Sequence, residues 1–162
     1  MSDRSKSGGP AAEATANEMT LHATCVALGD RGVLITGPSG SGKSDLALRL
    51  IDGGAKLVAD DLTTLRIEDG GIIALAPPRL AGKLEVRGIG IMPVPSVPEV
   101  RLALAVALAP SAEIERLPEP EAAQYLGLTL PRVTLDPFAA SAPAKVRLAL
   151  AAAEGGNASD AR

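Results

Sequence analysis

The sequence contains few aromatic residues, and this restricts both its core and its partners. Aromatic residues make up 1% of its 162 residues, with no Trp, one Tyr (Tyr125) and one Phe (Phe138). Because 46% of the residues are hydrophobic, a core of Leu, Ile, Val and Ala is available, which suits strands buried on both faces under covering helices. Proteins that bind single-stranded nucleic acids stack the bases on aromatic side chains, so we expect no such partner.

Cysteine, histidine, basic runs and long apolar runs are also scarce. The single cysteine, Cys25, excludes an internal disulfide and a cysteine metal cluster, and the single histidine, His22, excludes a site built from several histidines. A net charge of −3 without a long Lys/Arg run argues against a nucleic-acid partner. Residues 1–18 lack the apolar stretch of a signal peptide, and no window approaches the ~18 unbroken apolar residues of a membrane span. We therefore expect a cytoplasmic chain without a nucleic-acid or membrane partner.

The composition divides the chain into three parts. Residues 1–18 are rich in Ser, Gly, Ala and charged residues without a hydrophobic period, which predicts a disordered lead. Residues 154–162 have a similar composition and predict a disordered tail. Residues 19–153 contain no internal repeat and have the length of one domain.

The apolar pattern of the middle part predicts alternating strands and helices, and so an α/β fold. Strand-like runs occupy 20–28, 33–35, 57–59, 62–67, 72–76 and 101–109, and the fourth and fifth are joined by Glu68-Asp69-Gly70-Gly71 as a hairpin. Helical spacing follows Ser44 and ends near residues 52–54, and a second helix follows Ser141, with Val146, Ala149, Leu150 and Ala153 on one face. Residues 88–98 are rich in Gly and Pro and predict a loop.

The most specific motif follows the strand at 33–35. It consists of Gly37, Pro38, Ser39, Gly40, Ser41, Gly42, Lys43 and Ser44, which fit the pattern G-x-x-x-x-G-K-[ST] without a mismatch. With a strand before it and a helix after it, this pattern predicts a P-loop, whose backbone N–H groups converge on phosphate oxygens at a helix N-terminus. Lys43 would reach the β- and γ-phosphates and Ser44 would bind Mg²⁺. The alternative, a Gly/Ser-rich turn with a chance lysine, is disfavoured by the complete pattern and its flanks.

Two adjacent carboxylates, Asp60 and Asp61, stand at the end of the strand predicted at 57–59. In open α/β sheets, ligands bind at the carboxyl ends of the strands. One carboxylate would hold Mg²⁺ through water, and the other would accept a proton from an attacking hydroxyl. An isolated Asp-Asp pair is more often a helix cap or a solvated turn, but the position of this pair one helix after the P-loop favours a site.

Four separated segments resemble the catalytic domain of HPr kinase/phosphorylase, in a short form like those of alphaproteobacteria. They are His22, the P-loop at 37–44, Leu57-Val58-Ala59-Asp60-Asp61, and Leu84-Glu85-Val86-Arg87-Gly88-Ile89-Gly90-Ile91. Many proteins share the P-loop, whereas the last two segments are far more specific, and the resemblance extends over residues 20–153. It implies a P-loop kinase-like fold, with a mixed sheet flanked by helices. It also implies ATP and Mg²⁺ as cofactors, a hexameric assembly, and phosphorylation of a serine on HPr, the phosphocarrier of the sugar phosphotransferase system.

The resemblance also implies roles for single residues. His22 would lie beside the phosphate being transferred, and Lys43 would contact the nucleotide phosphates. Ser44 and Glu85 would bind Mg²⁺. Without the resemblance, Glu85 would be interpreted as a surface residue and His22 as a histidine of the core or of a sheet edge.

The remaining roles stay open between alternatives. One of Asp60 and Asp61 would take the substrate proton, and the sequence does not separate them. Arg116 would match the active-site arginine of the family, where it would neutralise charge on the transferred phosphoryl group. The alternative is that Arg116 is a solvated charge at the rim.

The chain also departs from the family pattern. Family members usually carry a separate N-terminal domain, for which this sequence has no room. Residues 93–96 (Pro-Val-Pro-Ser) replace a Phe-Gly element, and residues 136–141 lack the arginine of a segment that the family ties to dephosphorylation. We therefore predict kinase activity with weak or absent phosphorolysis. The alternatives are a small-molecule kinase or plain NTPase, and a nucleotide-sensing regulator without turnover.

Overall fold

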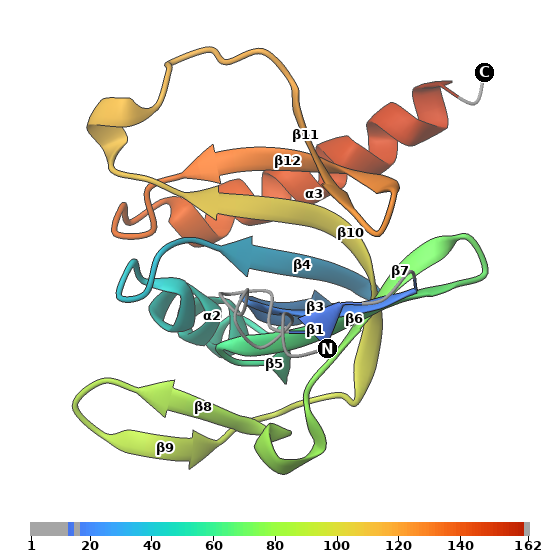
Figure 1. Cartoon of the computed structure of the whole chain (residues 1–162). Helices are drawn as coiled ribbons and strands as arrows, with labels where there is room; N and C mark the ends of the chain where they lie inside the picture. The colour runs from blue at the N-terminus through green and yellow to red at the C-terminus, as the bar shows by residue number, and fades with distance from the viewer. Residues whose placement is uncertain (1–12, 15–16, 161–162) are drawn as a thin grey trace.

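The computed structural model describes residues 13–14 and 17–160, which form a ten-stranded mixed sheet, a two-stranded sheet and two α-helices (Figure 1). The strands of the large sheet are β1 (Glu13–Ala14), β2 (Glu18–His22), β3 (Thr24–Leu28), β4 (Arg31–Thr36), β5 (Lys56–Ala59), β6 (Leu62–Glu68), β7 (Gly71–Leu75), β10 (Glu99–Leu108), β11 (Glu121–Tyr125) and β12 (Leu128–Leu135). The small sheet consists of β8 (Lys83–Val86) and β9 (Gly90–Pro93). The helices are α2 (Lys43–Asp52) and α3 (Ala142–Asp160), and two short 3-10 helices are η1 (Pro78–Leu80) and η2 (Ser111–Glu113).

Strand β10 lies at the centre of the large sheet, as the apolar run at 101–109 predicted. It pairs in parallel with β4 along one side. Along its other side, it pairs first with β7, antiparallel, and then with β12, parallel. Because β5 is antiparallel to β3, and β3 is antiparallel to β4, strand β5 also points the same way as β4. The ends of β4, β5, β10 and β12 therefore meet at one edge of the sheet, where the P-loop begins.

A bulge in β10 lets this strand contribute side chains to two hydrophobic clusters. Two leucines two residues apart in a regular strand face the same side. Here the pairing with β4 shifts its register between Leu102 and Leu104. Leu102 packs in one cluster with Val100, whereas Leu104 packs in the other with Val106. The bulge thus changes the face that the strand presents, which is the usual effect of an inserted residue.

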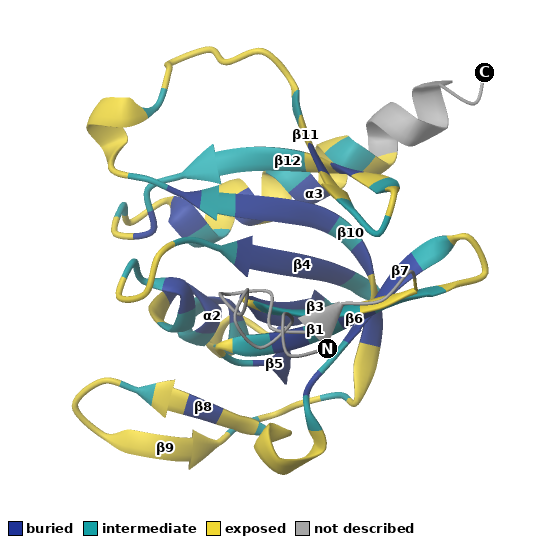
Figure 2. Cartoon of the chain, in the orientation of Figure 1, coloured by how far each residue is buried: buried dark blue, intermediate teal, exposed yellow. Residues whose placement is uncertain are grey.

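The two clusters lie on opposite faces of the sheet. One face is covered by both helices, through Leu46 and Leu50 of α2 and Val146 and Leu150 of α3, all at most 2% exposed. Burying such a side chain stabilises the fold by about 1.5–3 kcal/mol. Figure 2 shows β4 and β10 as largely buried between the covering elements.

The sheet itself covers its other face by curling. Leu65 of β6 and Ile72 of β7 pack in one cluster with Cys25 of β3 and Leu34 of β4. Burial raises the pKa of the Cys25 thiol far above its ordinary range. Cys25 therefore remains a protonated thiol that packs as a small apolar side chain.

The segment 20–28 is not one strand, contrary to the prediction from its apolar pattern. It is interrupted at Ala23: β2 pairs with β6, while β3 pairs with β4 and β5. The Ala23 amide donates to the Asp61 carbonyl (3.1 Å), and the Thr63 hydroxyl donates to the Ala23 carbonyl (2.8 Å). These bonds come from residues about 40 positions away, so the local pattern could not indicate the break.

The prediction of a loop over 88–98 was wrong for residues 90–93, which form β9. This strand pairs antiparallel with β8 around a turn in which the Ile89 amide donates to the Val86 carbonyl (2.9 Å). Gly88 and Gly90 have φ angles of 90° and 122°, in the left-handed region that glycine tolerates. Residues 95–97 then run beside β5, where the Leu57 amide donates to the Pro95 carbonyl (2.8 Å). The glycines therefore serve a hairpin turn.

Regular structure also occurs near both ends of the described chain. The lead predicted over 1–18 contains β1 and the first residue of β2, and residues 1–12 and 15–16 lie outside the described part. The backbone of α3 continues through Asp160, although a disordered tail was predicted from 154; residues 161–162 lie outside the described part. Over the residues that the structure describes, no helix has both the length and the apolar character to cross a membrane.

Candidate functional site

The P-loop joins β4 to α2 at the edge where the parallel strands end. Its strand and helix flanks are those that the sequence predicted. Gly40 and Gly42 have φ angles of 77° and 105°, which side chains other than hydrogen rarely allow. A Cβ at Gly42 would also lie 3.1 Å from side-chain atoms of Phe138 and Pro137. Gly42 caps α2 without a side-chain hydrogen bond, so the first amides of the helix are available to an anion.

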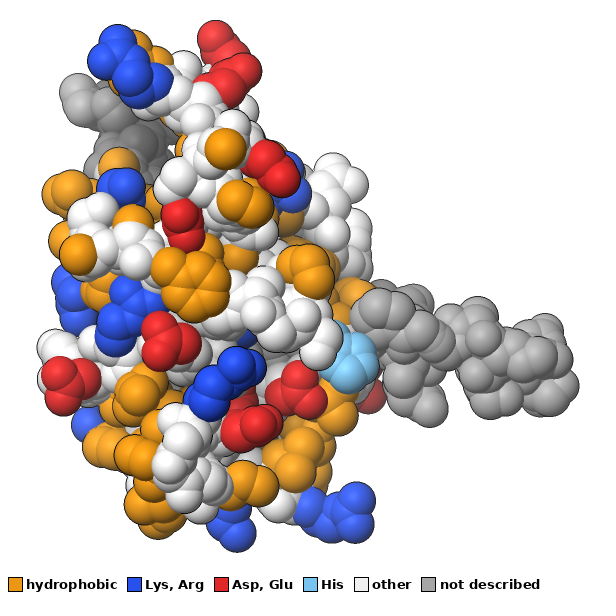
Figure 3. All heavy atoms as spheres, turned by 90° about the vertical axis from the view of Figure 1, so that its left-hand side faces the viewer, with side chains coloured by type: hydrophobic (Ala, Val, Ile, Leu, Met, Phe, Trp, Pro, Cys, Tyr) orange, Lys and Arg blue, Asp and Glu red, His pale blue; other side chains and the backbone are white. Residues whose placement is uncertain are grey.

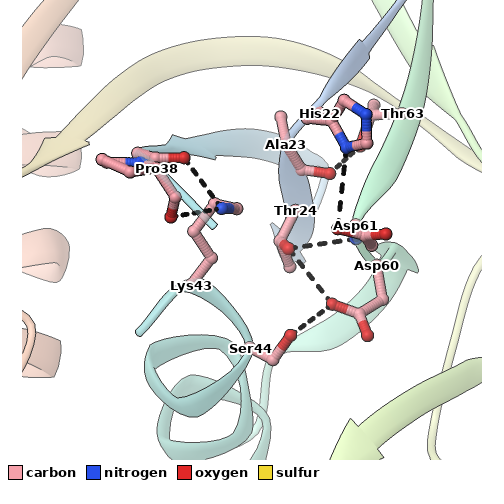
Figure 4. A network of polar contacts seen from close by, with 10 residues as sticks. His22, Ala23, Thr24, Pro38, Lys43, Ser44, Asp60, Asp61 and Thr63 are labelled. Atoms are coloured by element: carbon pink, nitrogen blue, oxygen red, sulfur yellow. Dashed lines mark hydrogen bonds and ion pairs between the residues drawn. The ribbon is translucent and has the colours of Figure 1, made fainter. Parts of the chain in front are cut away.

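The ammonium group of Lys43 is hydrogen-bonded to the backbone of this loop. The side chain is only 7% exposed. Its Nζ donates to the carbonyl oxygens of Gly37 (2.8 Å) and Pro38 (3.0 Å), as Figure 4 shows. An ammonium group has three N–H donors, so one donor remains for a phosphate oxygen. The bonds to both carbonyls offset the cost of burying this charge.

Asp60 is held by three elements at once. Its Oδ1 accepts from the Ser44 hydroxyl of α2 (2.6 Å) and from the Thr24 hydroxyl of β3 (3.1 Å). Its Oδ2 accepts from the Glu85 amide of β8 (3.0 Å). The carboxylate therefore has a fixed position directly beside the hydroxyl of Ser44 (Figure 4).

The Asp61 side chain is directed toward His22, and its backbone is left-handed, with φ at 70°. Its amide donates to the Thr24 hydroxyl (3.2 Å), and its carboxylate lies 3.8 Å from Nδ1 of His22. That separation is longer than a hydrogen bond. The Asp61 side chain is 69% exposed and that of His22 is 51% exposed, so this pair contributes little to stability.

Several predicted site residues line one cavity of about 400 Å³. This volume is typical of small-molecule sites. The predicted residues among its lining are Ser39, Gly40, Gly42, Lys43, Ser44, Asp61 and Glu85. Figure 3 faces this end of the molecule and shows acidic and basic side chains gathered close to the pale-blue histidine.

Arg116 is not part of this cavity. It lies exposed in the segment between η2 and β11 and lines a larger cavity of about 950 Å³ beside β12 and α3. That larger cavity contains no P-loop residue, so its size does not make it the site of phosphate chemistry. His22 is brought close to Asp61 but does not line the P-loop cavity.

The donor set fits magnesium better than a metal that needs a protein cage. Among the described residues, no group of three or more His, Cys, Asp or Glu side chains could hold a metal ion together. Mg²⁺ usually takes one or two carboxylates and completes its shell with water and substrate phosphate oxygens. The Ser44 hydroxyl, the adjacent Asp60 carboxylate and the Glu85 carboxylate at the cavity wall supply a donor set of this kind.

The sequence interpretation missed several residues at this site, among them Thr24, Arg87 and Phe138. Thr24 is fully buried and bonds to both aspartates; a threonine that interrupts an apolar strand was its signal. Arg87 and Phe138 line the cavity. Phe138 could have been singled out as the only phenylalanine of the chain, but nothing local placed it beside the P-loop.

Comparisons with known proteins agree with this geometry. The family model of the HPr serine kinase C-terminal domain matches residues 13–146. The HPr kinase/phosphorylase of Burkholderia lata is 38% identical over 127 residues, which cover 72% of this chain and 39% of that protein. The HPr kinase/phosphorylase of Clostridium tetani is 47% identical over 85 residues, which cover 52% of this chain and 28% of that protein. The matched part is thus well under half the length of either relative.

A solved structure of the same family is similar to this chain over most of its length. The Hpr(Ser) kinase/phosphatase from Coxiella burnetii matches with a TM-score of 0.75 and 30% sequence identity, and the match covers 87% of this chain and 96% of that chain. The α/β fold that the resemblance implied, a mixed sheet flanked by helices, is therefore confirmed. The chain belongs to the family of the HPr serine kinase C-terminal domain.

Proposed function

We propose that this domain is an ATP-dependent kinase that phosphorylates a serine of an HPr-like phosphocarrier protein. The observation that carries the proposal is the Asp60 carboxylate, fixed 2.6 Å from the Ser44 hydroxyl at the start of the P-loop helix. The names of the relatives support this substrate class. The cytoplasmic location remains a prediction from the composition, and the hexameric assembly remains a prediction from the family resemblance.

The P-loop residues would bind the triphosphate of ATP. The amides of Gly37 to Ser44 and the free donor of Lys43 would hold the phosphate oxygens. Magnesium, when bound at Ser44 and Glu85, would neutralise charge on the phosphates. Asp60 keeps the Ser44 hydroxyl oriented, since this hydroxyl already donates to its carboxylate.

The hydrogen bonds and exposure of the two aspartates support different roles for them in the reaction. Asp60 accepts three hydrogen bonds and has little freedom to take a proton from a substrate. Asp61 is 69% exposed and lines the cavity. We therefore assign proton acceptance from the attacking serine to Asp61, with His22 beside it.

Two further assignments rest on the family resemblance. Arg116 would act on the transferred phosphoryl group only if its exposed segment turned toward the P-loop cavity. Weak or absent phosphorolysis is supported by the segment at 136–141, which contains no Lys or Arg to attract inorganic phosphate. Arg49 of α2 contacts this segment, and its guanidinium donates to the Pro137 and Ala139 carbonyls.

The proposal is tested by transfer of the γ-phosphate of labelled ATP to an HPr-like protein. We expect labelling of the wild-type acceptor but not of an acceptor whose target serine is replaced by alanine. Asp61→Asn should lower the rate at least about 100-fold, since general-base catalysis contributes that much or more. Asp52→Asn, at an exposed position of α2, is the matched control and should leave the rate unchanged.

The same assay separates the alternatives. ATP hydrolysis that does not depend on the protein acceptor would indicate an NTPase or a small-molecule kinase. Binding of ATP without transfer to any acceptor would indicate a nucleotide-sensing regulator. Equal rates for the Asp61→Asn variant and the wild type would refute the assignment of the proton acceptor.

A further inference from the structure

The P-loop cavity is lined by both charged and apolar side chains. The charged ones include Lys43, Asp61 and Glu85, and the apolar ones are Leu48, Val86 and Phe138. A nucleotide likewise combines a highly charged triphosphate with an uncharged base.

Phe138 lies directly against the P-loop. A Cβ added at Gly42 would be 3.1 Å from Cζ of the Phe138 ring. The rest of this side chain faces water, with 69% of the residue exposed. A single exposed apolar residue is common on protein surfaces, so exposure alone does not indicate a function.

The backbone around Phe138 is fixed from several sides, which separates this residue from an ordinary exposed one. The Asp136 carboxylate accepts from the Phe138 amide (2.9 Å) and from the amide (3.2 Å) and hydroxyl (2.5 Å) of Ser111. On the other side, Arg49 of α2 donates to the carbonyls of Pro137 and Ala139. The ring is thus exposed while the chain that carries it is held in place.

We propose that Phe138 is the surface on which the base of the nucleotide rests, with Leu48 as a second apolar residue of the site. This inference rests on the proposed binding of a nucleoside triphosphate at the P-loop. The phosphates would be bound by Lys43, and the acceptor serine would lie at Asp61. The uncharged base then lies against the exposed ring of Phe138, where burying an aromatic surface is favourable.

Asp45 also lines the cavity, and its carboxylate is paired with Arg49 at 2.9 Å. Arg49 in turn holds the loop that carries Phe138. The pair therefore positions the ring and is not free to compete for the base.

The test compares ATP with inorganic tripolyphosphate, which has the phosphates but no base. Calorimetry with magnesium should show that Phe138→Ala weakens ATP binding on the order of 10-fold, the effect of losing one base–aromatic stack. Binding of tripolyphosphate should stay within about 2-fold, since no base is lost. Leu148→Ala, at another exposed apolar residue (71% exposed), is the matched control and should change neither affinity.

Each other outcome has a definite meaning. Unchanged ATP affinity in Phe138→Ala, or equal weakening of both ligands, would overturn the inference, because the ring would then add nothing or would support the P-loop itself. The inference also fails if the wild type binds ATP no more tightly than tripolyphosphate. If the wild type binds neither ligand, the proposed function fails first, and the inference with it.

A second variant tests the contact between residue 138 and the base directly. The chain contains no Trp, so Phe138→Trp introduces a single indole at the proposed surface. We expect this variant to retain ATP affinity and to show a fluorescence change with ATP but not with tripolyphosphate. An indole that responds equally to both ligands would contradict contact with the base.

Discussion

Thr24 connects the two aspartates of the site, and its hydroxyl can be removed with little change in shape. The residue is fully buried. Its hydroxyl donates to Oδ1 of Asp60 (3.1 Å) and accepts from the amide of Asp61 (3.2 Å). Thr24→Val replaces this hydroxyl by a methyl group, so Asp60 loses one of three donors and the Asp61 amide loses this acceptor.

The expected loss of stability follows from these two bonds. Leaving one buried donor without an acceptor costs about 1–3 kcal/mol. We therefore expect Thr24→Val to lower the free energy of unfolding by roughly 2 kcal/mol and the melting temperature by roughly 4–8 °C, as for domains of this size. Thr24→Ser retains the hydroxyl and should recover most of the loss.

The matched control is Thr63→Val. Thr63 is also fully buried, and its hydroxyl donates to the Ala23 carbonyl (2.8 Å) without bonding to either aspartate. Both valine variants should lose stability in urea titrations, but only Thr24→Val should lower the phosphate-transfer rate at 20 °C, by at least about 10-fold, because misplaced reacting groups are costly. Equal activities in the two variants, or an unchanged free energy of unfolding in Thr24→Val, would refute this reasoning.

Two further predictions concern the P-loop and the loop after β12. Lys43→Ala should lower phosphate transfer at least about 100-fold, as loss of a charge-stabilising donor does, while the circular dichroism spectrum stays that of the wild type; an active variant would contradict the P-loop assignment. The hydrogen bond from the Ser111 hydroxyl, and then that from the Phe138 amide, lower the pKa of Asp136. A carboxyl with a lowered pKa stabilises the fold above its unfolded-state pKa, and this contribution disappears as pH falls through the folded-state value. Thermal unfolding of Ser111→Ala should therefore show a deficit against the wild type at pH 7 that shrinks below about pH 4; a deficit that is constant with pH would exclude Asp136 as its source.

The parts of the fold that could be predicted from the sequence are those with local signals. The P-loop has a complete motif, and the helix after it has apolar residues at helical spacing. The hairpin of β6 and β7 has an Asp-Gly turn, with Asp69 and Gly70 at φ angles of 52° and 75°. In each case, the residues that determine the conformation lie within a few positions of one another.

The hairpin of β11 and β12 shows why the sequence did not predict some of the strands. Its two-residue turn is formed by Leu126 and Gly127, with φ angles of 54° and 81°. Asn or Asp usually occupies the first of these positions, so a leucine there gives no turn signal. The pairing of β12 with β10 fixes the turn instead, and such long-range pairing is not visible in a local pattern.

The candidate site was predicted as a set of residues but not as an arrangement. The motifs indicated that the P-loop and the aspartates belong together, and the structure places Ser44 beside Asp60. The motifs did not indicate that Arg116 lines a different cavity, since that depends on the path of an exposed segment. They also did not indicate Phe138, whose place beside Gly42 depends on the packing of the loop after β12.

The left-handed backbone of Asp61 determines which substitution isolates the role of its carboxylate. In an extended strand, the next residue would point to the opposite face of the sheet, but here the strand has ended and φ of Asp61 is 70°. This conformation costs on the order of 1–3 kcal/mol for a residue with a side chain, and Asp and Asn tolerate it better than most. The bonds of the Asp61 amide to Thr24 and of its carbonyl to the Ala23 amide offset that cost. Asparagine at this position therefore keeps the backbone and removes only the charge, whereas alanine would add strain to the loss of the carboxylate, so a rate lost in Asp61→Asn reports on the chemistry of the carboxylate alone.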